Sequence, residues 1–209
     1  MSACWPIADL PSDVESKRVP PKNGLQADAP RAARAGSRTL GITMTDAQAL
    51  AALEAAFAAA RKPDHFTDYE HCSECKDHDD VLRSRTRSTI QLSDVDNPGR
   101  NPINFLTPEG FCYYLPALAR LALSQEGEAF LVDLVPFHLC DTLYDKKAHR
   151  YHPWLTVLND EQRQAILQFV RHVASTRRGI MDPNGAYAEE LDRAVAFWEA
   201  ECKAPHTLA

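Results

Sequence analysis

Three segments of this chain open with a helix-capping residue and continue with apolar residues at helical spacing. Thr45, Thr107 and either Asn159 or Asp160 stand at these starts, and each side chain can accept a hydrogen bond from a first-turn amide. Behind each start, apolar residues recur every three or four positions, which is the period of a helix with one apolar face. The pattern predicts three helices, over residues 45–62, 107–124 and 160–178.

Weaker signals fill the rest of the chain. They predict a short helix over 72–84, an apolar helix within 128–144 that is broken before Pro136, and a last helix over 186–202. Residues 89–92 are a candidate for a lone short strand without an evident partner. Helices with one apolar face bury it by packing on one another. The sequence therefore predicts a mostly α fold, a single compact, bundle-like helical domain of five or six helices.

The first 43 residues differ in composition from the rest. They hold five of the fourteen prolines and three of the eight glycines, without helical or alternating apolar patterning. Such a segment cannot bury a core, so we expect a disordered tail over 1–43 and one helical domain over 44–209. Met44 directly precedes the first helix and is an alternative start of the native chain.

Net charge and hydropathy exclude broad classes of function. The whole chain carries −6, but the first 43 residues carry +2, so residues 44–209 carry −8. This acidity argues against a nucleic-acid binder and favours a protein partner. No apolar stretch approaches the roughly 20 residues of a membrane helix. Residues 1–20 contain no basic start followed by an apolar run, so we expect a cytoplasmic protein whose six cysteines stay reduced.

The densest cluster of chemical groups lies at 64–80, with three histidines, two cysteines and seven acids. Cys72 and Cys75 form a C-x2-C pair, and two thiolates at this spacing can take adjacent corners of a tetrahedral zinc site. On a helix, positions 72, 75 and 78 span about 120° of the surface, which favours His78 as a third ligand. A loop or a helix N-terminus would favour His71 instead. The sequence predicts a zinc site that draws on Cys72, Cys75, His78 and His71.

The fourth zinc ligand is left open by the spacing. Water and four side chains are the candidates: His65, His138, Cys140 and Cys112. Two other interpretations of the C-x2-C pair remain, a redox dithiol and two inert thiols. The neighbouring acids weigh against the redox interpretation, since negative charge raises the pKa of a thiol.

Two further clusters have plainer interpretations. A second set of potential ligands lies at 138–152 and is best explained as a polar connector: His138, Cys140, Asp141, Asp145, His149 and His152. Arginines alternate with serine and threonine at Arg83, Arg85 and Arg87, where a solvated loop is the simplest explanation.

Three motifs carry a resemblance to a known family: HCSEC at 71–75, NFLTPEGFCYYLPALARLAL at 104–123 and WLTVLNDEQRQAILQFVRHV at 154–173. Together they resemble an uncharacterised bacterial family of domains of unknown function, over roughly 45–200. The resemblance implies a small cytoplasmic bacterial protein, and it carries over no activity and no functional residues.

The sequence contains no complete catalytic constellation, so we expect a non-enzymatic protein in which zinc fastens the 64–80 segment to the helical core. Its expected work is protein binding or regulation. Two alternatives remain open. One is a metal-dependent hydrolase with a water ligand and Asp141 or Glu74 as base. The other is a thiol redox protein that uses the C-x2-C pair.

Overall fold

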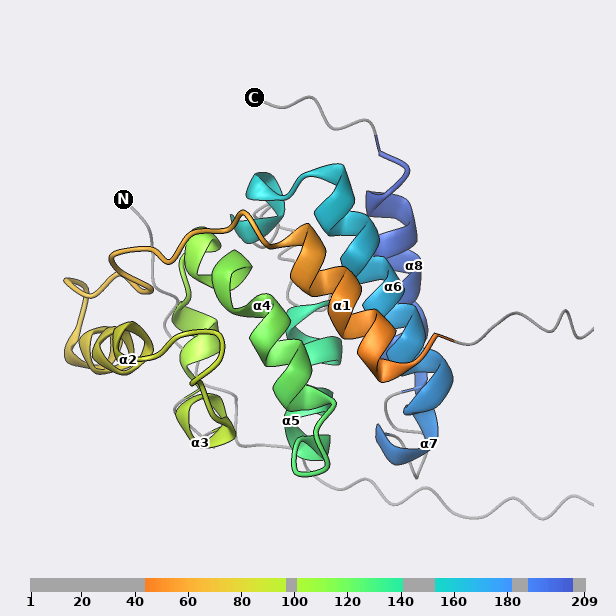
Figure 1. Cartoon of the computed structure of the whole chain (residues 1–209), viewed down its shortest axis with the longest axis horizontal. Coiled ribbons are helices and arrows are strands. Elements are labelled where there is room, and N and C mark those ends of the chain that lie inside the picture. The colour runs from red at the N-terminus through yellow and green to blue at the C-terminus, as the bar shows by residue number, and fades with distance from the viewer. Residues whose placement is uncertain (1–43, 97–100, 141–152, 182–187, 205–209) are drawn as a thin grey trace, which may run out of the picture. The chain divides into compact units, whose positions relative to one another are not determined.

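The computed structural model describes residues 44–96, 101–140, 153–181 and 188–204. Five helices of eleven residues or more occur in these ranges, together with shorter turns and no strand. The long helices are α1 (Asp46–Ala56), α2 (Ser73–Ser84), α4 (Pro108–Ala122), α6 (Asp160–Thr176) and α8 (Ala188–Glu201). The mostly α, bundle-like fold predicted from the sequence is confirmed (Figure 1).

Each predicted cap is present at its helix. The Thr45 side chain accepts a hydrogen bond from the Gln48 amide, and the Gln48 side-chain oxygen accepts one from the Thr45 amide, so the two residues form a capping box. Thr107 accepts from the Gly110 amide, with Pro108 in the first turn of α4. Asn159 caps α6 and forms the same reciprocal pair with Gln162.

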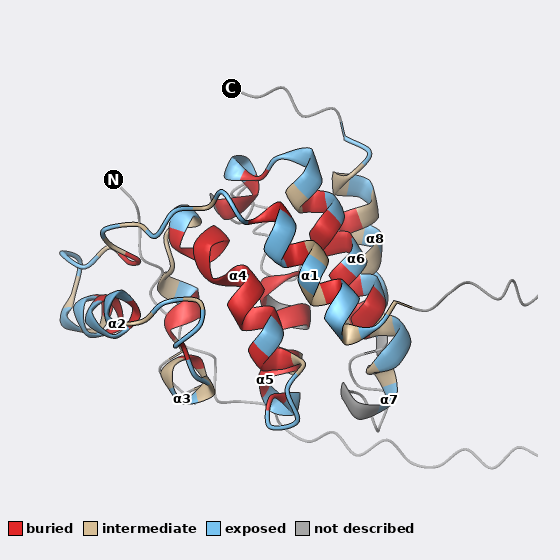
Figure 2. Ribbon diagram, in the orientation of Figure 1, coloured by how far each residue is buried: buried red, intermediate tan, exposed pale blue. Residues whose placement is uncertain are grey.

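The most buried of the long helices is α4. Twelve of its fifteen residues are buried, whereas α1 and α6 each keep an exposed face (Figure 2). Helix α4 packs against α1, α5 (Glu128–Val132) and the η4 turn (Pro153–Val157), while α6 packs against both α1 and α8. A row of stacked rings joins three of these elements, since Phe111 stacks on Trp154 and Trp154 on Trp198.

The apolar segment after α5 differs from its prediction. It is not broken before Pro136, because the η2 turn (Asp133–His138) continues through that residue as a π-helix. The amide of Leu139 reaches back to the carbonyl of Leu134, a five-residue step that marks this wider coil. Trp198 Nε1 donates to the Leu139 carbonyl at 2.8 Å, so α8 fastens the end of the turn.

Two smaller expectations are also wrong. Residues 89–92 form no strand; the Thr86 and Thr89 side chains bond within their own turn, and helix α3 (Leu92–Val95) follows. Helix α1 ends at Ala56 and not near residue 62. The guanidinium of Arg87 explains part of this early end, since its Nη2 donates to the carbonyls of Phe57 and Ala60.

The solvated-loop prediction is wrong for two of the three alternating arginines. Arg87 also donates from Nε to the Tyr113 carbonyl and lies over the Tyr113 ring, 4.7 Å from its centre. Arg85 forms a two-pronged ion pair with Asp94, with both contacts at 3.0 Å. Arg83 keeps about half of its side chain exposed.

The remaining short elements are η1 (Pro102–Phe105) and α7 (Arg178–Met181). Among the described residues, no helix combines the length and apolar character needed to cross a membrane. The predicted tail over 1–43 and the connector residues Asp141, Asp145, His149 and His152 lie outside the described residues.

Candidate metal centre

The C-x2-C pair lies at the start of α2. Cys72 is the N-cap residue of this helix, with extended backbone angles (φ −160°, ψ 168°), and its Sγ accepts a hydrogen bond from the Cys75 amide at 3.4 Å. A sulfur therefore takes the place that serine or threonine usually takes at a helix start. Because Cys75 is one turn further on, the cap turns both thiols toward each other.

Three ligand groups meet at this point. The two sulfurs of Cys72 and Cys75 are 3.3 Å apart, and His71 Nδ1 lies 3.8 Å from the Cys75 sulfur. All three ligand atoms lie within 4.8 Å of one another. In a tetrahedral zinc site, bond lengths near 2.3 Å to sulfur and 2.0 Å to nitrogen place two sulfurs about 3.8 Å apart and a sulfur and a nitrogen about 3.5 Å apart. The sulfur–sulfur distance of 3.3 Å and the sulfur–nitrogen distance of 3.8 Å therefore each lie within about half an ångström of the values for such an ion.

The cluster is open on one side. Cys75 is fully buried, Cys72 is half-buried and His71 is exposed. Within the ranges that the structure describes, the group of potential ligands contains these three residues and no fourth. An ion held here would consequently keep a coordination position toward solvent.

The Cys72 thiol is acidified by its position. The pKa of Cys72 falls from 9.0 to about 7, first through the hydrogen bond from the Cys75 backbone amide and then through those with the side chains of His71 and Cys75. The expectation that neighbouring acids raise this pKa is therefore wrong. Amide and side-chain donors contact the sulfur directly, whereas no carboxylate is among the main influences on its pKa.

His78, the third ligand favoured by helical spacing, lies elsewhere. It is buried on α2, where its ring stacks on Phe105 at 5.1 Å and its Nε2 lies 3.7 Å from the Glu74 carboxylate. His78 would share a helix face with Cys72 only if Cys72 were inside the helix. Because Cys72 is the cap, the residue before it, His71, reaches the sulfurs instead. The participation of His78 in a metal site stays a prediction.

The four side chains considered as a fourth ligand lie outside the sulfur cluster. His65 Nδ1 bonds to Asp79 at 2.8 Å and its ring stacks on Tyr69. Cys112 is buried in α4, where burial raises the pKa of its thiol to about 12. Cys140 and His138 are buried near η2, and the Cys140 thiol donates to the Glu190 carbonyl. Of the candidates for the fourth ligand, water alone is compatible with the described geometry.

One residue that positions the cluster was not anticipated from the sequence. Asp79, with its side chain 2% exposed, accepts hydrogen bonds from the Phe66 amide at 2.6 Å and the Thr67 amide at 3.3 Å, and it holds His65 with its other oxygen. Thr67 in turn donates to the Cys75 carbonyl at 2.7 Å. The loop before His71 is thereby fastened to α2.

The sequence contains a signal for this role of Asp79. The buried positions of α2 are Cys75, His78, Asp79 and Leu82. They follow the spacing of one helix face, so an aspartate at that spacing is expected to need partners inside the protein.

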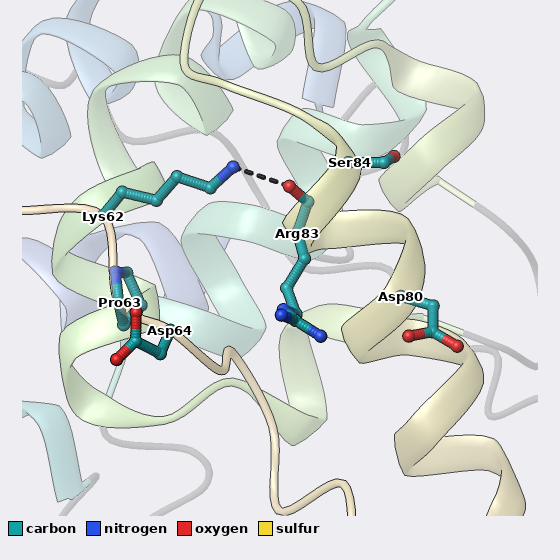
Figure 3. A pocket seen from close by; sticks show the side chains of 6 residues that line it. All are labelled: Lys62, Pro63, Asp64, Asp80, Arg83 and Ser84. Carbon is teal, nitrogen blue, oxygen red and sulfur yellow. Dashed lines mark hydrogen bonds between the residues drawn. The ribbon is translucent and has the colours of Figure 1, made fainter.

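A separate open pocket lies at the other end of α2 (Figure 3). Its lining residues are Lys62, Pro63, Asp64, Asp80, Arg83 and Ser84. Lys62 extends across it and donates to the carbonyls of Arg83 and Arg85, at 2.6 and 2.8 Å, so its ammonium satisfies the C-terminal end of the helix. Eleven residues of helical rise, about 16 Å, separate Cys72 from Arg83. The pocket is therefore not a cleft beside the sulfur cluster.

Comparison with known families identifies the chain as a whole. Residues 46–202 match the sequence profile of DUF6714, described as a family of unknown function. This chain belongs to DUF6714. The match confirms the resemblance to a family of domains of unknown function, and it spans all the described long helices. No curated protein and no solved structure matches the chain.

Proposed function

We propose that this DUF6714 protein is a non-enzymatic cytoplasmic bacterial binding module with a structural zinc ion at the N-terminal end of α2. Cys72, Cys75 and His71 hold the ion. The convergence of these three ligand atoms within 4.8 Å is the observation that supports the proposal. Two thiolates and one imidazole suit zinc, and the cytoplasm keeps thiols available for it.

The ion would add a further link between a loop and a helix that already contact each other. His71 lies at the end of the loop that follows α1, and Cys75 belongs to the first turn of α2. A metal bond between them adds to the contacts made by Asp79 and Thr67, which join the same loop and helix. Zinc would thus fix how α2 is presented at the surface, which is a structural and not a chemical role.

The partner proposed for residues 44–209 is a basic protein. Residues 44–209 carry −8, which favours association with positive charge and disfavours nucleic acid. Affinity capture at low salt followed by a high-salt wash tests this assignment. A basic protein released by salt agrees with it, whereas capture of nucleic acid contradicts it.

The zinc proposal is tested by elemental analysis of untagged protein purified without chelators. We expect about one zinc per chain for the wild type, and a loss of most of it for Cys72→Ser and His71→Ala. Cys202→Ser is the matched control, because this thiol lies at the end of α8 and outside the cluster. Zinc near zero in the wild type, or zinc unchanged by Cys72→Ser, would overturn the proposal.

A metal-dependent hydrolase is the second candidate, because three protein ligands and one open position are also the pattern of catalytic zinc sites. Glu74 is the described candidate base, and it lies 3.7 Å from His78; the other candidate, Asp141, falls outside the described residues. X-ray absorption at the zinc edge separates the two functions. A fourth ligand from protein favours the structural role, and a bound water favours catalysis.

A further inference from the structure

The same end of α2 has the geometry of a thiol–disulfide couple. The sulfurs of Cys72 and Cys75 are 3.3 Å apart, and a disulfide bond is about 2.05 Å long, so an approach of about 1.3 Å joins them. Cys72 is the N-cap residue of α2 and Cys75 is its third helical residue, and the N-cap backbone is already extended. Rotation of the two cysteine side chains is the motion that would bring the sulfurs together.

The two cysteines differ in accessibility, and this difference assigns them separate roles. Cys72 is half-buried, at the mouth of the cluster, and a small disulfide can reach it from solvent. Cys75 is fully buried behind it. The outer thiol is therefore the one that reacts with an external disulfide, and the inner thiol is the one that resolves the product.

From this arrangement we propose that metal-free protein undergoes reversible thiol–disulfide exchange with low-molecular-weight disulfides, with Cys72 as the attacking thiol and Cys75 as the resolving thiol. The inference does not rest on the zinc proposal. It shares the ligands of that site, so zinc and the disulfide exclude each other.

The exchange has two balanced steps. In the first, the Cys72 sulfur attacks one sulfur of the external disulfide, whose S–S bond breaks; a mixed disulfide forms, and the departing thiolate takes up the proton that Cys72 loses. In the second, the Cys75 sulfur attacks the Cys72 sulfur of the mixed disulfide and expels the second external thiolate, which takes up the proton that Cys75 loses. Two protein thiols are oxidised, and one external disulfide is reduced to two thiols.

The other described cysteines are poorly suited to this reaction. Cys112 and Cys140 are buried in the core, and burial raises the pKa of both Cys112 and Cys202. They provide internal controls, because a reaction confined to the α2 pair separates specific exchange from general oxidation of thiols.

The test uses full-length protein that has been reduced, stripped of metal with a chelator and incubated with glutathione disulfide. After the remaining thiols are alkylated, trypsin releases Cys72 and Cys75 together in peptide 62–76, since cleavage follows Arg61 and Lys76 and the bond before Pro63 resists it. In the wild type we expect this peptide to lose two hydrogen atoms and to carry no glutathione. Dithiothreitol should restore both thiols.

Variants distinguish the two roles. Cys75→Ser should stop at one glutathione on Cys72, and Cys72→Ser should leave Cys75 reduced, while Cys202→Ser should behave as the wild type. Circular dichroism verifies that each variant is folded, and the wild-type peptide decides the question by itself if a variant is not. A stable glutathione adduct in the wild type, or equal reactivity of both single variants, would overturn the inference. Zinc content measured on reduced protein is independent of this outcome, so either proposal can fail alone.

Discussion

Replacing Asp79 by alanine removes the acceptor that holds the 64–68 loop against α2. The carboxylate accepts hydrogen bonds from the Phe66 amide at 2.6 Å and the Thr67 amide at 3.3 Å, and it also forms one with His65. Phe66 is fully buried, so its amide finds no water when the carboxylate is gone. Hydrogen bonds to a charged group contribute about 1.5–3 kcal/mol each, and part of this is offset because the carboxylate no longer has to be buried. We expect a loss of about 3 kcal/mol in the free energy of unfolding.

Urea unfolding followed by tryptophan fluorescence measures this loss, because Trp154 and Trp198 are both buried. With a slope of about 2 kcal/mol per molar urea, the midpoint should fall by about 1.5 M. Asp79→Asn keeps one oxygen for the amides and should lose about half as much. The matched control is Asp80→Ala, one residue further along α2 but exposed, which should change stability by less than about 0.5 kcal/mol.

Unfolding of Asp79→Ala at the same urea concentration as Asp80→Ala would contradict a stabilising role of the Asp79 carboxylate. That result would mean that the loop is held by its other contacts and that Asp79 contributes nothing to the free energy of unfolding. A fall of the expected size should be accompanied by weaker zinc binding, because the loop ends at His71.

Three further substitutions test individual contacts between elements of the fold. Arg87→Ala should lower the free energy of unfolding by about 2–3 kcal/mol in the same urea assay, since three backbone carbonyls each lose a hydrogen bond from the guanidinium, and Arg87→Lys should recover only part of this. Tyr114→Phe should lose about 1 kcal/mol, because its buried hydroxyl donates to the Leu82 carbonyl at 2.7 Å, and a loss near zero would contradict the importance of that bond. Partial burial raises the pKa of Asp46, but the hydrogen bond from His172 and the charge of Arg177 outweigh it, so the pKa lies below its ordinary value of 3.8. The ionised carboxylate therefore stabilises the fold above pH 3.8, and this stabilisation is lost as pH falls through the lowered pKa. Thermal unfolding measured from about pH 7 to pH 3 tests this. The difference in melting temperature between the wild type and Asp46→Asn should shrink below about pH 4.

Local features of the fold were predictable from the sequence. A cap and its partner lie three residues apart, as Thr45 and Gln48 do, so the whole interaction is contained in a short window. The apolar spacing that follows determines which face is buried, because a helix needs that face covered. These two signals were enough to predict the long helices and the mostly α fold.

Long-range features could not be obtained in this way. Arg87 caps α1 through carbonyls 27 and 30 residues earlier in the chain, and nothing in its own neighbourhood distinguishes it from Arg83. In the candidate metal centre, the residue at which α2 begins determines which histidine lies beside the two sulfurs. A cap at Cys72 brings in His71, whereas a helix that started one turn earlier would present another face.

Helix α2 packs on few of the other described elements, and this determines how metal binding at its N-terminal end can be detected. Helix α2 has η1 as its principal neighbour among the described elements, while α1, α4, α6 and α8 pack mainly on one another and on other turns. Such an element can open by itself, and amide hydrogen exchange in it then reports a local free energy that is smaller than that of the whole bundle. A ligand at 100 times its dissociation constant adds about 2.7 kcal/mol to the opening of the part it binds. Metal binding at Cys72 should therefore slow exchange in α2 and the loop before it, while the exchange rates of the bundle change little.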